Sequence, residues 1–481
     1  MSKLCLTITE TSLESVYNTI KNNFDNIDLV ELRVDFLDIS EQCKIDTFKC
    51  NKPVILTFRK KIDGGLYCGD ESYREKILIQ GIKSGNFSYV DLEEDLHSTD
   101  IDKAVLSSGI RVIRSFHDFN GVPQNLADRI KNIIRNSNEI PKAAVMINGT
   151  NELLTFYKEV EKLGFITKIV LGMGSYGFNT RILAERIGSY LTFCSKEGSS
   201  AAPGHVSPQL LNDIYRFRKI ERNWKIMGII GNPVMHTKSP LIHNRGYKEL
   251  DLNAVYVPFE TNNLEQFMEI CKLLNIEGFS VTVPFKNDII PLLDGVTESV
   301  KQIGACNTVT RVGDKWIGDN SDYVGFINPL LQAYGSIQDK QISVIGAGGA
   351  AKAAVFALKS HGAKVVILNR TLKNAEVLAK DFNTDCAELS IDSIDTLNRF
   401  SDIIVQTTNV GMHPLESINP LDFYTFSGNE FVYDIIYSPE KTILLDKAEK
   451  AGCRILNGWK MLEEQAYRQF KLFTGLEYPL K

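Results

Sequence analysis

Strand-like and helical segments alternate regularly over the first ~200 residues, and this alternation constrains the fold more than any other feature. Runs rich in apolar and β-branched residues recur eight times, at residues 3–9, 28–35, 53–59, 89–94, 111–117, 143–147, 168–172 and 190–195. Apolar strands separated by helices are typical of parallel strands in βα units, and eight such units favour a (β/α)8 barrel. A doubly wound open sheet is the competing interpretation, and the number and length of the strands disfavour it.

The length of the chain predicts more than one domain, since 481 residues exceed what a single core accommodates. A charged helix expected over 208–225 runs into a new strand at 225–231, which places a boundary near residue 222 and makes 1–222 the first domain. We expect an α/β lobe over 223–334 and a βαβ lobe over 335–455. The helical spacing of apolar residues over 462–473 predicts a last helix, so that 456–481 completes the first of these lobes.

Composition narrows the class of protein. A net charge of −5 and a pI near 5.9 argue against a nucleic-acid partner, and no apolar run is long enough to span a membrane. The N-terminus begins directly with a strand, which predicts that there is no signal peptide. The nine cysteines include no CxxC pair and no zinc-binding spacing, so we expect no metal site and a cytoplasmic protein.

Residues capable of chemistry collect where barrel strands end, which is where parallel barrels place their active sites. Lys142 opens the sixth strand among apolar neighbours, where desolvation would favour a neutral amine able to attack a ketone. His117 ends the fifth strand and is the candidate acid/base. Taken singly, such a lysine is more often a surface residue and such a histidine a structural one. Their joint occurrence favours catalysis, together with acids and arginines suited to binding a carboxylate: Glu31, Arg33, Arg59, Asp63 and Arg181.

The motifs ELRVD, TFR, SFHDF, IPKAAVM and AAPGH, in this order over residues 3–220, resemble type I 3-dehydroquinate dehydratase. The resemblance implies a TIM barrel in which Lys142 forms a Schiff base with the ketone of 3-dehydroquinate. His117 would carry the proton from the neighbouring carbon to the departing hydroxyl. The residues that would hold the substrate are Glu31, Arg33, Arg59 and Arg181.

Three positions depart from that family's pattern. Asp63 stands where the family has a glutamate thought to orient the histidine, and Ala201 replaces a serine. His205, which matches a substrate-binding position, replaces a glutamine. These changes concern closure over the substrate and leave the Schiff-base chemistry intact.

The second half contains a glycine-rich turn between a strand and a helix. Such a turn lets backbone N–H groups approach a pyrophosphate at the helix N-terminus. The candidate cofactor-binding residues of this turn are Gly346, Ala347, Gly348, Gly349 and Ala350. The next strand ends in Asn369, Arg370 and Thr371, with Lys373 close behind, where an NAD enzyme normally has an acid. The basic residues favour the 2′-phosphate of NADP; a tight turn with exposed basic side chains is the alternative.

A lysine and an aspartate in this half form a candidate proton relay. Lys286 follows an apolar strand, and Asp322 supplies a carboxylate. Such a pair can exchange a proton with a hydroxyl or ketone if the two are close. An exposed ion pair is the alternative. Thr237 and Ser239 supply hydroxyls in a loop after a strand, and Asn307 supplies an amide.

The motifs GNP, VTVPFK, GACNT, DNSD, GAGGAAKA and NRT resemble shikimate dehydrogenase over about 225–481. The resemblance implies a two-lobed α/β dehydrogenase with a Rossmann NADP-binding lobe, and it makes Lys286 and Asp322 the catalytic pair. Thr237 replaces a serine beside the substrate carboxylate, which bears on the choice between shikimate and quinate. The positions that would contact shikimate are Thr237, Ser239, Thr282, Asn307, Tyr437 and Gln465.

The two halves would catalyse consecutive reactions, from 3-dehydroquinate to 3-dehydroshikimate and then, with NADPH, to shikimate. The product of the first is the substrate of the second, so the two assignments support each other. One alternative is a quinate/shikimate dehydrogenase fusion that works oxidatively. The other is a non-catalytic sensor on the same domains, which the presence of Lys142, His117, Lys286 and Asp322 disfavours.

Overall fold

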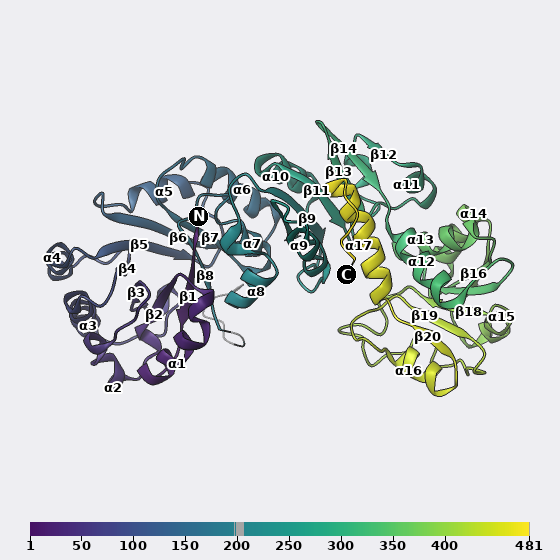
Figure 1. Cartoon of the computed structure of the whole chain (residues 1–481), viewed down its shortest axis with the longest axis horizontal. Coiled ribbons are helices and arrows are strands. Elements are labelled where there is room, and N and C mark those ends of the chain that lie inside the picture. Colours follow the sequence, from purple (N-terminus) through teal and green to yellow (C-terminus); the bar gives the residue numbers. More distant parts are fainter. Residues whose placement is uncertain (197, 199–205, 481) are drawn as a thin grey trace. The chain divides into compact units, whose positions relative to one another are not determined.

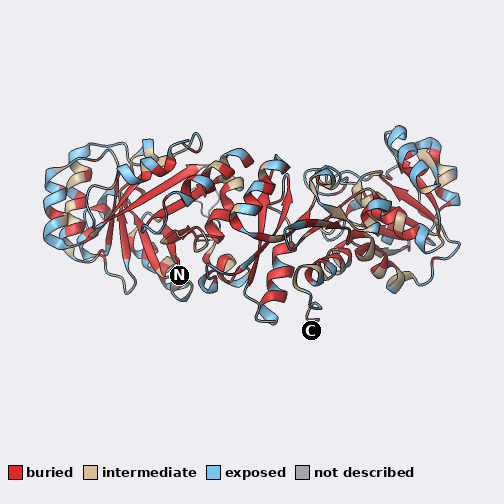
Figure 2. Cartoon of the chain, turned by 90° about the horizontal axis from the view of Figure 1, so that it is seen from above, coloured by how far each residue is buried: buried red, intermediate tan, exposed pale blue. Residues whose placement is uncertain are grey.

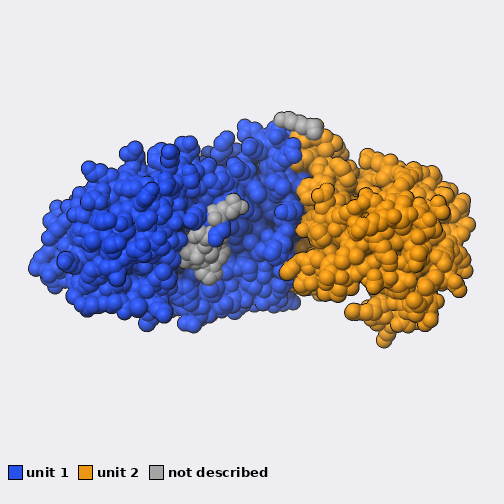
Figure 3. All heavy atoms as spheres, turned by 90° about the horizontal axis from the view of Figure 1, so that it is seen from below, with its two compact units in different colours: residues 1–276 blue, residues 277–481 orange. Residues whose placement is uncertain are grey.

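The computed structural model describes residues 1–196, 198 and 206–480. The chain divides into two compact units, Met1–Ile276 and Glu277–Lys481, which Figure 3 colours separately. The domain boundary that we predict near residue 222 falls inside the first unit and stays a prediction. Within the described residues, no helix is both long and apolar enough to cross a membrane.

Eight parallel strands form a barrel in the first unit (Figure 1). Each strand pairs with the next along the chain, and β1 pairs with both β2 and β8. Strands β7 and β8 meet through the single bridge between Lys168 and Ser189, which closes the ring. The barrel prediction is confirmed, and the open sheet is excluded. The strands are β1 (Lys3–Ile8), β2 (Leu29–Arg33), β3 (Val54–Thr57), β4 (Tyr89–Glu93), β5 (Arg111–Asp118), β6 (Glu139–Met146), β7 (Ile169–Met173) and β8 (Leu191–Cys194).

The barrel strands are buried almost throughout, as Figure 2 shows in red. Apolar side chains from all eight strands, such as Leu29, Ile113 and Ile169, form the hydrophobic core inside the barrel. Strand β6 starts earlier than predicted, so Lys142 lies inside it rather than at its opening. The surrounding helices are α1 (Leu13–Asn23), α2 (Ile39–Gln42), α3 (Glu71–Ser84), α4 (Thr99–Ser108), α5 (Leu126–Asn132), α6 (Thr150–Glu161), α7 (Gly174–Ile182) and α8 (Pro208–Asp213).

The junction after the barrel differs from the single helix predicted over 208–225. Helix α8 ends at Asp213, and a short 3-10 turn, Phe217–Lys219, follows. Arg216 breaks the helix because its backbone is left-handed, with φ 53°. Its guanidinium donates to the carbonyl oxygen of Leu252 at 2.5 Å and lies over the Trp224 ring at 4.5 Å. Contacts with residues distant in sequence therefore override the local helical pattern.

The first unit continues past the barrel with two parallel strands, β9 (Lys225–Gly231) and β10 (Ala254–Glu260), and two helices, α9 (Ser239–Glu249) and α10 (Leu264–Leu274). Helix α10 packs against α6, and β10 packs against α7. Polar contacts reinforce this packing: Ser175 donates to Glu260 at 3.0 Å, and Lys158 pairs with Glu269 at 2.8 Å.

The second unit begins in β11 (Ile276–Val281), which pairs antiparallel with β13 (Thr308–Val312). Strand β13 pairs antiparallel with β14 (Lys315–Asp319), and β14 pairs with the short β12 (Gly295–Val296). Helices α12 (Asp322–Tyr334) and α17 (Trp459–Thr474) pack together, which confirms the predicted last helix. Helix α11 (Glu298–Ile303) leads into the loop before β13.

The rest of the second unit is built around a sheet of six parallel strands, in the order β17-β16-β15-β18-β19-β20. This is the strand order of a dinucleotide-binding sheet, and it confirms the predicted Rossmann lobe. Helices α12, α13 and α14 cover one face, and α15 and α16 cover the other. The bounds are β15 (Gln341–Ile345), β16 (Lys364–Asn369), β17 (Asp385–Glu388), β18 (Ile403–Gln406), β19 (Phe431–Asp434), β20 (Arg454–Leu456), α13 (Gly349–Ser360), α14 (Leu372–Phe382), α15 (Ile394–Arg399) and α16 (Ile443–Lys450).

Candidate active sites

A pocket in the barrel gathers most of the catalytic candidates of the first half. Thr7, Phe119 and Phe193 contribute to its wall. Arg181 is not among the lining residues, and His205 lies outside the described residues. The sequence-predicted residues that line the pocket are Glu31, Arg33, Arg59, Asp63, His117 and Lys142.

Lys142 is buried beside acids, although its neighbours in sequence are apolar. Its Nζ lies 2.8 Å from Asp91 Oδ2 and 3.6 Å from Glu31 Oε1. It also lies 4.3 Å from the centre of the Phe193 ring. The apolar surroundings expected from residues 140–147 are therefore wrong, because strands β2 and β4 place carboxylates around the amine.

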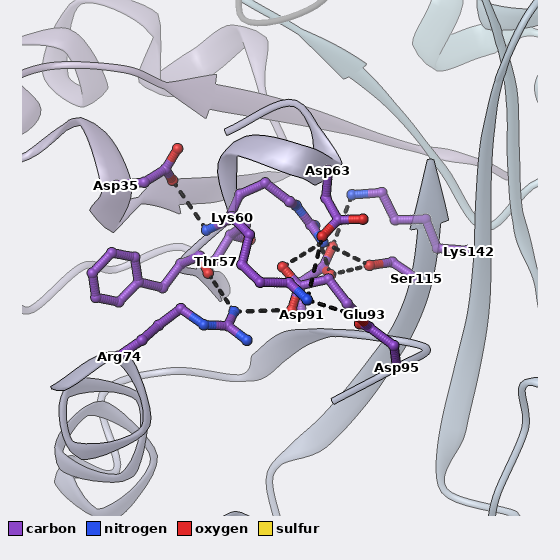
Figure 4. A network of polar contacts seen from close by, with 12 residues as sticks. Asp35, Thr57, Lys60, Asp63, Arg74, Asp91, Glu93, Asp95, Ser115 and Lys142 are labelled. Carbon is purple, nitrogen blue, oxygen red and sulfur yellow. Dashed lines mark hydrogen bonds and ion pairs between the residues drawn. The ribbon is translucent and has the colours of Figure 1, made fainter. Parts of the chain in front are cut away.

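Arg59 lines the pocket and is paired with two buried carboxylates, Asp91 and Glu93, which Figure 4 labels. Its guanidinium lies 2.7 Å from Asp91 Oδ1 and 3.2 Å from Glu93 Oε1, and it donates to Ser115 Oγ at 2.9 Å. Burial opposes the charged form, but the two acids outweigh it and raise the pKa of Arg59 above its ordinary value. Arg59 therefore uses several of its N–H donors for contacts with other side chains of the protein.

His117 is half-buried in the pocket, next to positive charges. Burial, then Arg59 and Lys142, lower the pKa of the His117 ring well below its ordinary value, so the ring is neutral near pH 7. Among the described residues, neither His117 Nδ1 nor Asp63 Oδ2 has a hydrogen-bond partner. Burial also raises the pKa of Asp63. The two groups that we expected to act together are thus in one pocket without a direct hydrogen bond.

The two remaining arginines are fixed differently. Arg33 makes a bidentate pair with Asp35, with nitrogen–oxygen distances of 2.9 and 2.7 Å. Asp35 also accepts from the backbone N–H groups of Arg59 and Leu66. Arg181 lies on α7 and is fully buried, and this burial lowers the pKa of its guanidinium to about 10.

Sequence reasoning missed the acids of strand β4. Asp91 and Glu93 are two residues apart in a strand, so both side chains point to the same face. Two acids at alternate positions of an otherwise apolar strand, flanked by Val90 and Leu92, were the available signal. Glu93 extends this set of buried ion pairs to helix α3, because it also pairs with Arg74 at 2.9 Å.

The second unit brings three predicted residues together. Lys286 Nζ lies 2.5 Å from Asp322 Oδ2, and Asn307 donates to Asp322 Oδ1 at 2.7 Å. Asp322 opens helix α12 and is mostly buried, whereas Lys286 keeps partial exposure. The Lys286 carbonyl accepts from Cys306 N–H at 2.7 Å, which ties the two segments together. The predicted pair thus forms, with an amide holding the carboxylate in place.

Helix α17 adds a residue that the sequence did not single out. Gln469 donates to the Asn307 carbonyl at 3.2 Å and accepts from Ser280 at 2.7 Å, so it fixes the strand that leads to the Lys–Asp pair. Gln465 lies one turn earlier and donates to the Leu462 carbonyl at 3.1 Å.

Four other predicted substrate contacts lie in different parts of the chain. Thr282 directly follows β11. Tyr437 lies beside Trp459, with ring centres 6.4 Å apart. In the first unit, Thr237 precedes α9 and Ser239 is the first residue of α9, and their hydroxyl oxygens are 3.2 Å apart.

The glycine turn follows β15 as predicted. Gly346 has φ 113°, and a Cβ there would lie 2.6 Å from Thr407 Oγ1, so only glycine fits. A Cβ on Gly349 would lie 3.3 Å from Lys286 Cδ, which places the start of α13 beside the Lys–Asp pair. At the end of β16, Asn369 Nδ2 donates to the Thr371 carbonyl at 2.9 Å. The exposed side chains there are Arg370, Thr371 and Lys373.

In the described part of the chain, no group of three or more His, Cys, Asp or Glu side chains is arranged to hold a metal ion. The nine cysteines, all within the described residues, are thiols, and five of them are buried.

Family models match both halves. One described as type I 3-dehydroquinase matches residues 4–222, the shikimate dehydrogenase substrate binding domain matches 229–309, and shikimate/quinate 5-dehydrogenase matches 330–417. A shikimate dehydrogenase (NADP(+)) of Caldanaerobacter subterraneus is 41% identical over 53% of this chain and 94% of the relative. A solved shikimate dehydrogenase in complex with NADP+ is 36% identical, with a TM-score of 0.51 over 54% of this chain and 93% of that one.

One relative spans both halves. A chloroplastic bifunctional 3-dehydroquinate dehydratase/shikimate dehydrogenase of Arabidopsis thaliana is 34% identical over 99% of this chain and 83% of its own length. The match extends across barrel, junction and dehydrogenase lobes in the same order, which confirms the predicted combination of two shikimate-pathway activities. This chain therefore belongs to the family of bifunctional 3-dehydroquinate dehydratase/shikimate dehydrogenases.

Proposed function

We propose that the barrel dehydrates 3-dehydroquinate through a Schiff base on Lys142. The amine adds to the ketone, water leaves, and the iminium that remains withdraws electrons from the adjacent carbon. His117 accepts a proton from that carbon and returns it to the departing hydroxyl, which leaves as water. Hydrolysis of the iminium then frees the lysine. The observation that carries this proposal is the position of a buried amine and a neutral imidazole in one pocket.

Borohydride trapping tests this step. Reduction during turnover should add one reduced ligand to Lys142, and peptide mass mapping should find the adduct there. Lys168 is the internal control, because it is also a buried barrel lysine but its Nζ donates to the Gly164 carbonyl at 2.8 Å. The variant Lys142→Met should give no adduct. An adduct on Lys168, or none in the wild-type chain, would refute the proposal.

For the second half, we infer that Lys286 and Asp322 handle the proton when 3-dehydroshikimate is reduced to shikimate. NADPH, when bound, supplies the hydride. Lys286 donates a proton to the substrate oxygen, and Asp322 holds its ammonium 2.5 Å away and is itself held by Asn307. The substrate hydroxyls and carboxylate would contact Thr237, Ser239, Thr282, Asn307, Tyr437 and Gln465.

A matched pair of variants separates this role from a structural ion pair. Lys286→Met should lower the dehydrogenase kcat by about 100-fold or more, the usual scale for loss of a general acid. Lys301→Met is the control, because Lys301 forms an exposed pair with Glu298 in the same unit, at 3.4 Å. Equal activity of the two variants would refute the role of Lys286.

The cofactor of this half is, in our proposal, NADP rather than NAD. The Gly346–Ala350 turn and the start of α13 would hold the pyrophosphate, and Arg370 and Lys373 would pair with the 2′-phosphate. The shikimate dehydrogenase in complex with NADP+ supports this choice by similarity. Arg370→Ala should raise the KM for NADPH far more than that for NADH, whereas Lys380→Ala, at an exposed position of α14, should not. Equal losses with both cofactors would refute it.

The alternative, oxidative use of quinate, is favoured only by the threonine at position 237. A spectrophotometric assay of quinate and shikimate with NADP+ and NAD+ distinguishes the two, and we expect shikimate with NADP+ to be preferred. Efficient oxidation of quinate would support the alternative. The cytoplasmic location stays a prediction, as does the domain boundary near residue 222.

A further inference from the structure

Asp91 contacts three polar side chains, and two of them, Arg59 and Lys142, line the dehydratase pocket. Figure 4 shows Asp91 with its neighbours Ser115 and Lys142. The Asp91 side chain is fully buried on strand β4. Oδ1 accepts from the Arg59 guanidinium at 2.7 Å and from Ser115 Oγ at 2.5 Å. Oδ2 accepts from Lys142 Nζ at 2.8 Å. One oxygen is therefore anchored in the protein, and the other faces the amine.

The Asp91 carboxylate stays ionised. Burial would raise its pKa, but Arg59 and Lys142 outweigh burial and hold the pKa of Asp91 well below its ordinary range. Glu31 is a weaker partner of the amine, because it lies 3.6 Å away and accepts from the hydroxyls of Thr7 and Thr57. Among the described acids, Asp91 is thus the one within hydrogen-bond distance of Lys142.

We propose that Asp91 is a positioning residue of the dehydratase, which holds the Lys142 nitrogen before condensation and accepts the N–H of the iminium afterwards. The inference rests on the Schiff base proposed above. On condensation the nitrogen forms a double bond to the substrate carbon, the ketone oxygen leaves as water, and the nitrogen retains one hydrogen and a positive charge. A fixed carboxylate at that hydrogen stabilises the cation and orients the C=N plane.

The same geometry changes the role of Arg59. Because its guanidinium pairs with Asp91 and Glu93, its charge anchors the carboxylate that contacts Lys142. Arg59 is then the support of the lysine rather than a free site for the substrate carboxylate. The proposal therefore links three strands, β3, β4 and β6, through one chain of charged contacts.

Two variants of strand β4 test the proposal in the full-length enzyme. Asp91→Asn keeps the shape of the side chain and removes its charge. Glu93→Gln is the matched control, because Glu93 is equally buried and contacts Arg59 but makes no contact with Lys142. The measurements are kcat and KM for 3-dehydroquinate and the rate at which borohydride traps an adduct on Lys142. Circular dichroism and thermal unfolding report whether each variant is folded, and shikimate oxidation by the same preparation reports the amount of full-length enzyme.

We expect Asp91→Asn to lower kcat by about 10- to 100-fold, the effect of losing one hydrogen bond to a charged group, and to slow trapping in parallel. KM should change by about threefold or less, because Asp91 contacts the lysine rather than the bound substrate. Glu93→Gln should lower kcat by about threefold at most. Unchanged kcat in Asp91→Asn, or an equal loss in Glu93→Gln, would overturn the proposal.

Two controls keep the result interpretable. If Asp91→Asn does not fold, Ser115→Ala takes its place, because it removes one anchor of Asp91 Oδ1 without removing the charge. A fall in kcat of about threefold to tenfold with unchanged KM is then expected, and unchanged kcat overturns the proposal. If the wild-type chain itself gives no adduct on Lys142, the Schiff base fails. If the wild type and Asp91→Asn are trapped at equal rates, only the role of Asp91 fails.

Discussion

Asn262 connects the barrel to the segment that follows it, and its removal is the sharpest test of how the first unit is held together. Its side-chain oxygen accepts from Thr150 N–H at 3.0 Å and from Thr150 Oγ1 at 2.8 Å. Thr150 begins helix α6 and is completely buried, and Gly149 at the N-cap position has no side chain to offer. A residue 112 positions away in the sequence therefore caps a barrel helix.

The expected cost of Asn262→Ala follows from these contacts. Loss of a helix N-cap costs about 1 kcal/mol, and a buried donor left without a partner costs about 1–3 kcal/mol. The Thr150 hydroxyl still accepts from Asn262 N–H at 2.9 Å, which limits the loss. We expect the free energy of unfolding to fall by about 2–3 kcal/mol. For a unit of 276 residues, in which 1 kcal/mol shifts the Tm by about 2 °C, that corresponds to a Tm lower by about 4–6 °C.

Thermal unfolding followed by circular dichroism, together with heat inactivation of the dehydratase, measures this effect. Asn262→Asp should keep a Tm within about 2 °C of the wild type, because its carboxylate accepts the same bonds and favours the helix N-terminus. Glu269→Ala is the control, since it removes only the exposed pair with Lys158 and should cost less than about 1 kcal/mol. If Asn262→Ala melts within about 1 °C of the wild type, or no lower than Glu269→Ala, the reasoning is wrong.

Two further predictions concern the second unit. Gly346→Ala should reduce dehydrogenase activity by about 10-fold or more and leave dehydratase activity unchanged, because a Cβ would lie 2.6 Å from Thr407 Oγ1 at φ 113°; steady-state assays of both reactions check this. Burial raises the pKa of Asp434 to about 6 in the folded chain, although Ile436 N–H and Thr442 bond to it. The folded chain binds the Asp434 proton more tightly than the unfolded chain does. Protonation of Asp434 therefore stabilises the fold fully below pH ~4, and this stabilisation is lost as the pH rises through about 6. Asp434→Asn should therefore raise the Tm at pH 8 more than at pH 4, and an equal change at both would contradict this.

The barrel strands and the first two strands of the Rossmann sheet could be predicted from the sequence, because buried parallel strands are short apolar runs between helices. The same local patterns predicted the glycine turn at Gly346. The pairing of Lys286 with Asp322 followed from the resemblance to shikimate dehydrogenase, since local pattern alone left an exposed ion pair open. Local patterns failed for the surroundings of Lys142. Its partners Asp91 and Glu31 come from strands that lie 51 and 111 residues earlier, and only closure of the barrel brings them to the amine.

The backbone of the junction after the barrel is a second feature that local sequence patterns did not predict. A charged helix over 208–225 satisfied local propensity, yet Arg216 takes a left-handed conformation. The guanidinium of Arg216 then reaches carbonyl oxygens at the start of β10, and this nonlocal contact replaces the helical hydrogen bonds. Propensity is a weak preference of a few tenths of a kcal/mol per residue, so a buried charged hydrogen bond overrides it.

These contacts also explain why the chain divides into compact units at Ile276 rather than at the boundary that we predict near residue 222. Residues 225–276 match the dehydrogenase substrate-binding domain over most of their length, but they cap α6 through Asn262 and bond to α7 through Glu260. Helices α6 and α7 directly follow the strands that carry Lys142 and Met173 at the pocket. A barrel cut at residue 222 would lose these contacts to two active-site segments, so we expect it to unfold at a lower temperature than the barrel of the full chain.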